Sequence, residues 1–266
     1  MLAFFGEGNS GRTDCEEAGI MSKRMPETKS ESLFLEYCNL RGYVAKRISS
    51  AADGGRFSDY EVTIGQNHII AEIKELQANP TDKNVAKIIQ ENRIEVYGDE
   101  PGRRVRTHIE DAEKQLRRYV GQRVPCLVVL YDNIVVNDFR PYHPGGFLQE
   151  ISNPLNPYHI DVGMYGLQAA QLRIHQDGRT ESLGDVRGSK RTLRFQHQDN
   201  ISSVVTLHDY APDYGLFLIV YHNFFAKNPL PKTVFANSKD KQLEKPDHPE
   251  SCPGSWRQIQ IVEDEK

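Results

Sequence analysis

The chain has 266 residues, of which 38% are hydrophobic and 9% aromatic, and its formal net charge is −4. This length and composition can supply the core of one large domain, and no apolar run approaches the length of a membrane span. The first apolar run, residues 2–5, is too short for a secretory signal peptide, and the four cysteines lack short-range pairing. We therefore expect a cytoplasmic protein without membrane contact.

The negative charge is concentrated at the two ends of the chain. Residues 1–20 and 240–266 each carry −3, which leaves +2 for residues 21–239. Charge and composition divide the chain into three parts: a flexible N-terminal extension (1–28), one domain (29–238) and a polar C-terminal tail (239–266). Residues 239–254 are expected to form a disordered linker, after which Trp256 could dock back or bind a partner.

An amphipathic helix is predicted over residues 30–40, because its apolar side chains recur on one face. Ser30 is the expected N-cap, and Gly42 suits the left-handed position that ends many helices. A first strand is then predicted over residues 43–48, followed by a polar loop that leads to Asp59.

A hairpin is predicted from residues 58–64 and 68–74, which alternate polar and apolar side chains. The alternation places Glu72 and Lys74 on one face and the apolar side chains between them on the other. Asp59 begins the partner strand. Two carboxylates and an amine in an otherwise apolar hairpin are costly to desolvate unless they bind something. The hairpin is therefore a candidate metal site.

The segment that follows the hairpin is less regular. Residues 77–107 are expected to form an insertion with a helix over residues 82–96. A second amphipathic helix is predicted over residues 108–120, and the spacing of four places Gln115 and Tyr119 on one of its faces.

The remaining elements follow this second helix. Residues 125–131 predict a buried central strand. A long loop rich in Pro, Gly and His is expected over residues 137–159, and a short helix over residues 166–174. Two further strands, over residues 202–207 and 215–221, are expected to extend or cover the same sheet, or alternatively to form a small subdomain.

These elements and two of their motifs resemble the PD-(D/E)XK nuclease superfamily. The superfamily signature is an acidic residue on the second strand of the core and Glu-x-Lys on the third. Asp59 and residues 72–74 match it, with Ser58 where a proline is usual. Gln115 and Tyr119 are similar to a Gln-x-x-x-Tyr motif found in the exonuclease branch.

The resemblance covers residues 29–131. It implies an α/β fold with a restriction-endonuclease-like core of helix, three-strand meander, helix and strand, extended here by C-terminal strands. It also implies a metal-dependent nuclease that hydrolyses phosphodiester bonds of nucleic acid, with Mg²⁺ or Mn²⁺ as the cofactor. DNA is the substrate we expect first, and a homodimer is left open.

The resemblance further implies a set of metal ligands. Asp59, Glu72 and the Ile73 carbonyl would hold the ion through hard oxygen atoms. A glutamate of the first helix often completes the shell in this superfamily, and Glu31 lies nearest the expected spacing, with Glu36 as the second choice. Alternatively, Glu31 is an acid favoured by the helix N-terminus and Glu36 is a solvated charge.

Catalysis would involve the two acidic ligands together with Lys74 and Gln115. Lys74 would orient the attacking water or stabilise negative charge, and Gln115 would position the water or a phosphate. Residues 101–123 carry seven Lys or Arg against three acids, so they could contact phosphates or simply form a solvated face. The candidate nucleic-acid-binding residues are Arg103, Arg104, Arg106, Arg118 and Tyr119.

Two other interpretations are open. In the first, the chain is a catalytically inert nuclease-fold module that binds nucleic acid or a protein partner. In the second, it is an α/β interaction protein in which Lys74 forms a structural salt bridge with Glu72 or Asp59.

Overall fold

The computed structural model describes part of the chain. The described residues are 28–48, 59–91, 102–119, 121–136, 153–165, 170–174, 180–185, 199–209, 215–249 and 255–260. The expected N-terminal extension lies outside them except for Thr28. None of the helices in these ranges is long and apolar enough to cross a membrane.

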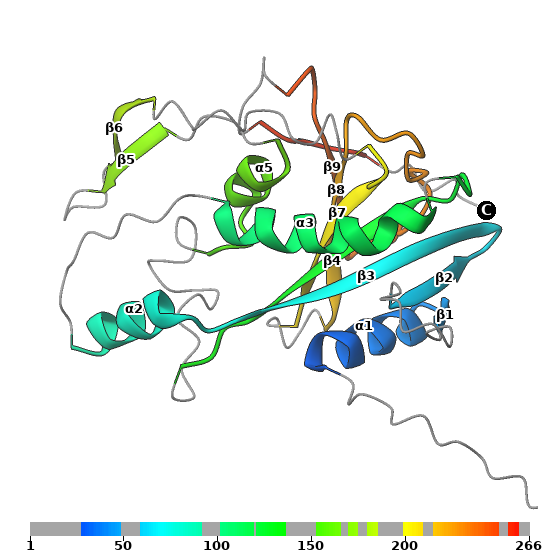
Figure 1. Ribbon diagram of the computed structural model, residues 1–266, viewed down its shortest axis with the longest axis horizontal. Helices are drawn as coiled ribbons and strands as arrows, with labels where there is room; N and C mark the ends of the chain where they lie inside the picture. The colour runs from blue at the N-terminus through cyan, green and yellow to red at the C-terminus, as the bar shows by residue number, and fades with distance from the viewer. Residues whose placement is uncertain are drawn as a thin grey trace, which may run out of the picture.

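The centre of the protein is an eight-stranded mixed sheet, ordered β1-β2-β3-β4-β7-β8-β9-β10 (Figure 1). Its strands are β1 (Val44–Arg47), β2 (Tyr60–Ile64), β3 (Asn67–Gln77), β4 (Cys126–Asn133), β7 (Ser203–His208), β8 (Phe217–His222), β9 (Lys241–Glu244) and β10 (Arg257–Gln258). The first three form an antiparallel meander, and β4 and β7 continue parallel to β3. A separate antiparallel pair consists of β5 (Ala170–Ile174) and β6 (Thr180–Asp185).

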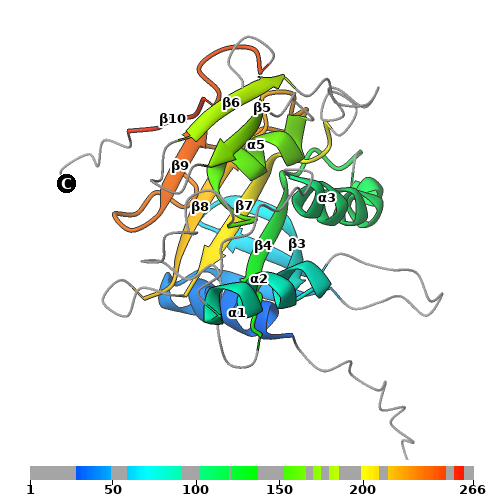
Figure 2. The same cartoon turned by 90° about the vertical axis from the view of Figure 1, so that its left-hand side faces the viewer.

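Helices cover both faces of this sheet: α1 (Lys29–Leu40) lies on one face, and α3 (Arg103–Leu116), continued by the 3₁₀ turn η1 (Arg117–Tyr119), lies on the other with α5 (Pro157–Tyr165). The remaining helix, α2 (Pro80–Gln90), follows the end of β3 (Figure 1). The α3 and α5 helices lie side by side (Figure 2). Two glycines permit this approach, because a Cβ atom on Gly102 would lie 2.6 Å from the backbone nitrogen of Gly163.

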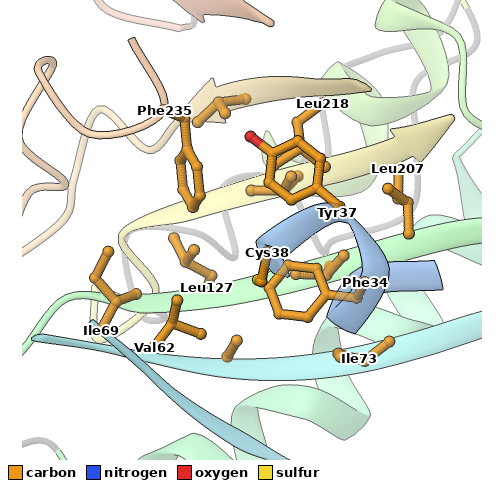
Figure 3. Close-up of a cluster of buried hydrophobic side chains, with 14 of the residues drawn as sticks. Phe34, Tyr37, Cys38, Val62, Ile69, Ile73, Leu127, Leu207, Leu218 and Phe235 are labelled. Carbon is orange, nitrogen blue, oxygen red and sulfur yellow. The ribbon is translucent and has the colours of Figure 1, made fainter. Parts of the chain in front are cut away.

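The alternation of β3 separates the two cores. Ile69, Ala71 and Ile73 pack with α1 on one face (Figure 3), whereas Ile70 and Leu76 pack with α3 and α5 on the other. This confirms the predicted faces of the hairpin, and it leaves the side chains at positions 72 and 74 on the α3 face.

The first helix begins at Lys29, one residue before the predicted range of 30–40. Thr28, and not Ser30, is its N-cap, because a capping box forms between Thr28 and Glu31. The Glu31 carboxylate accepts a hydrogen bond from the Thr28 N–H at 2.8 Å. Gly42 has a φ of +69°, as its predicted position after the helix requires.

The second predicted helix is also longer at its N-terminus. It begins at Arg103 instead of residue 108, and its buried stripe already includes Val105. The α-helix ends at Leu116, so Tyr119 lies in the following 3₁₀ turn. The helix predicted over residues 82–96 corresponds to α2, which begins at Pro80 and ends at Gln90.

The two C-terminal strands predicted over 202–207 and 215–221 are confirmed as β7 and β8, and they extend the sheet. One neighbouring prediction is wrong, because residues 170–174 form a strand instead of a helix. The long loop expected over residues 137–159 ends slightly earlier, since α5 begins at Pro157, and residues 137–152 lie outside the described residues.

The linker predicted over residues 239–254 is wrong where the structure describes it. β9 pairs in parallel with β8, and the Asp240 carboxylate accepts hydrogen bonds from the Leu218 N–H, at 2.8 Å, and from the Tyr37 hydroxyl. Trp256 does dock back, with its ring 5.0 Å from that of Tyr221. Polar sequence concealed this edge of the sheet, because its strands are held by side-chain hydrogen bonds as well as by apolar contacts.

Candidate active site

The candidate site lies where β2 parts from β3. The ladder between these strands ends at the pair Tyr60–Ala71, whereas β3 continues as far as Gln77. Asp59 stands just before β2, and its Oδ2 atom accepts a hydrogen bond from the Ile73 N–H at 2.6 Å. The Asp59 side chain thus replaces a backbone acceptor for the N–H of Ile73, which is the second residue of β3 beyond the ladder.

Glu72 projects from the opposite face of β3 to Ile73, toward α3. Its Oε1 atom lies 2.6 Å from the Lys74 ammonium and also accepts a hydrogen bond from the Gln115 side-chain amide. The structure therefore brings Asp59, Glu72, Lys74 and Gln115 together, although 43 residues separate Glu72 from Gln115.

The second carboxylate oxygen of Glu72 is buried at the candidate site. Glu72 is 1% exposed, and its Oε2 atom is one of several buried side-chain atoms in the described part of the chain that lack a hydrogen-bond partner. The backbone N–H of Asp59 acts on the same carboxylate and lowers its pKa. A buried acceptor that lacks a partner costs free energy, so such an atom calls for a ligand or a proton.

The pKa values of both acids are raised. Burial raises the pKa of Glu72 to about 7, the charge of Asp59 adds to the effect, and the charge of Lys74 opposes it. Burial also raises the pKa of Asp59, where the hydrogen bond from Ile73 opposes the shift and the charge of Glu31 adds to it. Two carboxylates that each disfavour the charge of the other are suited to share a cation.

The donor set fits Mg²⁺ better than a metal that requires a closed protein cage. No group of three or more His, Cys, Asp or Glu within the described ranges is arranged to hold a metal ion. Mg²⁺ keeps several waters and is commonly held by one or two carboxylates. Asp59 and Glu72 can supply these, and the Ile73 carbonyl lies on the same edge of β3 as the N–H that Asp59 accepts.

Glu31 is engaged elsewhere. One of its carboxylate oxygens belongs to the capping box with Thr28, and the other lies 2.8 Å from the Arg47 guanidinium. It would have to release Arg47 to bind a metal. Its contacts agree with the alternative role at the helix N-terminus, and its role as a metal ligand stays a prediction. Glu36 is exposed, as a solvated charge would be.

Two of the candidate nucleic-acid-binding residues serve the fold instead. Arg104 lies 3.0 Å from the Asp82 carboxylate and donates to the Gln77 carbonyl at 2.6 Å, so it ties α3 to α2 and to the end of β3. Tyr119 is 8% exposed and packs in the core, which leaves no ring face for a base. The other three candidates, Arg103, Arg106 and Arg118, are also at least partly exposed.

One residue of this region was missed by the sequence prediction. His108 lies on α3, seven positions before Gln115 and therefore on the same helix face. Burial lowers its pKa, and the nearby charges of Arg104 and Lys74 lower it further. Its spacing of seven residues from Gln115 was the available signal. Because residue 108 is the first residue of the predicted helix, the sequence did not define the helix face on which its side chain lies.

Comparison of the chain with protein-family models, with curated proteins and with solved structures found no match.

Proposed function

We propose that this protein is a metal-dependent nuclease of the PD-(D/E)XK type that hydrolyses phosphodiester bonds, with DNA as the expected substrate. One observation carries the proposal. Asp59, Glu72, Lys74 and Gln115 meet where β2 leaves β3, and a buried oxygen of Glu72 has no partner among the described residues. The succession of α1, the β1–β3 meander, α3 and a parallel β4 also agrees with the core that the sequence motif implies.

The chain's own residues divide the work between them. Mg²⁺ or Mn²⁺, when bound, would supply an acidified water and neutralise charge on the phosphodiester. Gln115 and Lys74 occupy the Oε1 atom of Glu72, which leaves the Oε2 atom for the ion. The hydrogen bond from the Ile73 N–H holds the Asp59 carboxylate in place, so the second proposed ligand is preorganised. Lys74, whose side chain is 19% exposed, would orient the water or stabilise charge on the phosphate.

The direct contact between Lys74 and Glu72 favours a second candidate. In an α/β interaction protein that does no chemistry, this ion pair would be purely structural. Such a pair does not require Asp59, whose charge raises the pKa of Glu72 and so weakens the pair. The two candidates differ in the effect expected of Glu72→Gln. A protein that does no chemistry would lose only a buried charge, whereas a nuclease would lose a metal ligand and with it the cleavage activity.

Cleavage assays would test the proposal. End-labelled single- and double-stranded DNA and RNA would be incubated with the purified protein in Mg²⁺, Mn²⁺ or EDTA. We expect metal-dependent cleavage that Glu72→Gln and Lys74→Ala abolish and that Glu61→Gln retains. Glu61 is a matched control because it is an exposed carboxylate on β2. Salt-sensitive binding without cleavage would support the inert module, and the absence of both would overturn the nuclease proposal and support the interaction protein.

A further inference from the structure

α3 follows the second half of β3 in the opposite direction (Figure 1). Two contacts fix its register: Gln115 reaches Glu72 near one end, and Arg104 reaches the carbonyl of Gln77, at 2.6 Å, at the other. Eleven helical residues and five strand residues each advance by about 16 Å, so the helix and the strand remain aligned between the two contacts.

His108 lies between these contacts, four positions after Arg104 and seven before Gln115. Lys74 is the β3 residue that faces α3 midway between Glu72 and Leu76. The electrostatic influence of Lys74 on His108 agrees with this alignment. The alignment therefore places the imidazole and the ammonium near each other between α3 and β3, on the side of β3 that carries Glu72.

The groups that act on His108 are predominantly cationic. Arg104 lies one turn before it on α3, and Lys74 lies across on β3. Asp111, the acid that acts in the opposite sense, is already paired with Lys114 at 2.6 Å. Protonation of His108 is disfavoured in this setting, and an anion bound among these groups would reverse that effect.

We propose that His108 and Lys74 bind a phosphate group and form a subsite beside the candidate metal ligands. The inference rests on the proposed function in one respect: the phosphate would belong to the nucleic-acid strand that enters the site. A neutral imidazole donates one N–H, and the ammonium has two N–H groups besides the one that it donates to Glu72, which suits a ligand with several acceptor oxygens. An internal phosphodiester and a terminal phosphate share this chemistry.

Histidine NMR in EDTA would test the subsite without cleavage. The ring signal of His108 is assigned by its loss in His108→Gln, and its pH titration is recorded with and without inorganic phosphate. We expect phosphate to raise the pKa of His108, whereas the ring signal of His68, an exposed histidine on β3, should not respond to phosphate. An unchanged titration of His108 would overturn the inference.

Oligonucleotide binding in EDTA provides a second measurement. We expect His108→Gln to weaken binding about tenfold, as the loss of one charge-assisted hydrogen bond implies, and His68→Gln to have no effect. Comparison of 5′-phosphorylated with unphosphorylated oligonucleotide distinguishes a terminal phosphate from an internal one. Equal affinity of His108→Gln and wild type for both would overturn the inference.

The two proposals can fail separately. If phosphate shifts the titration of His108 but no nucleic acid is cleaved in any metal, the subsite stands and the nuclease assignment fails. If cleavage occurs and His108 does not respond to phosphate, the nuclease assignment stands and the subsite fails.

Discussion

The Asp59 carboxylate accepts a hydrogen bond from the Ile73 N–H at 2.6 Å, across the point where two antiparallel strands part. This bond does two things. It supplies the ladder acceptor that β2 no longer provides, and it fixes a carboxylate beside Glu72, the residue that precedes Ile73. The structural and the proposed chemical role of Asp59 are therefore separable by substitution.

Asp59→Ala and Asp59→Asn are expected to differ in stability but not in activity. Alanine leaves the Ile73 N–H without its acceptor, which costs about 1–3 kcal/mol of unfolding free energy, whereas the asparagine side chain keeps an acceptor oxygen. Both remove the charge and should abolish cleavage. Urea unfolding measures the difference, and equal stability of the two variants would contradict the role given to this bond.

Glu72 is expected to make the stability of the metal-free protein depend on pH. Its pKa rises from 4.5 to about 7 on folding, so the folded protein binds a proton that the unfolded chain has released between these values. The unfolding free energy should therefore decrease as the pH rises from about 4.5 to 7, by on the order of 3 kcal/mol at most.

The variant Glu72→Gln tests this pH dependence. Glutamine cannot ionise, so the decrease should vanish, and the variant should be more stable than wild type at pH 8 in EDTA. Urea unfolding at pH 5 and pH 8 provides the comparison. A variant with the same pH dependence as wild type would show that Glu72 ionises normally in the fold.

Added Mg²⁺ is expected to stabilise the wild-type protein and not Glu72→Gln. A ligand that binds only the folded state at one hundred times its Kd adds about 2.7 kcal/mol to the unfolding free energy. Protons compete for the same carboxylates, so the stabilisation should increase between pH 5 and pH 8. Thermal unfolding with Glu61→Gln as the control measures it, and equal stabilisation of Glu72→Gln would place the ion elsewhere.

The hairpin could be predicted from sequence because its information is local. Asp59, Glu72 and Lys74 lie within sixteen residues, and the period of two assigns their faces without knowledge of the rest of the chain. Gln115 also followed from a motif, on a helix whose apolar stripe was evident. These predictions depended on short-range periodicity, which the structure keeps.

Long-range partners account for the parts of the structure that could not be predicted. Glu31 pairs with Arg47, and Arg104 with Asp82, and neither pairing is visible in a sequence. β9 is polar because its side chains hydrogen-bond with neighbouring segments, as the Gln242 amide does with the backbone carbonyl of Val234 at 2.7 Å, and such a strand resembles a linker in composition. Charge alone could not separate a phosphate contact from an ion pair that holds two helices together.

Arg104→Ala is expected to weaken the fold and not the binding of nucleic acid. The side chain joins α3 to Asp82, which is 2% exposed, and to the Gln77 carbonyl. Removal leaves a buried carboxylate with fewer partners, which should cost on the order of 2 kcal/mol because Arg104 itself is partly exposed. Faster hydrogen exchange in α2 should accompany the loss.

Arg103→Ala is the matched control, because Arg103 is the exposed neighbour of Arg104 on the same helix. A surface substitution of this kind should change stability by less than about 0.5 kcal/mol. Oligonucleotide affinity measured across a range of salt concentrations separates the two roles. If Arg104 contacted a phosphate, Arg104→Ala would reduce the number of counterions released on binding by about one and would leave the free energy of unfolding unchanged. The ion pair with Asp82 predicts the opposite combination, since the guanidinium is already committed to a carboxylate within the fold.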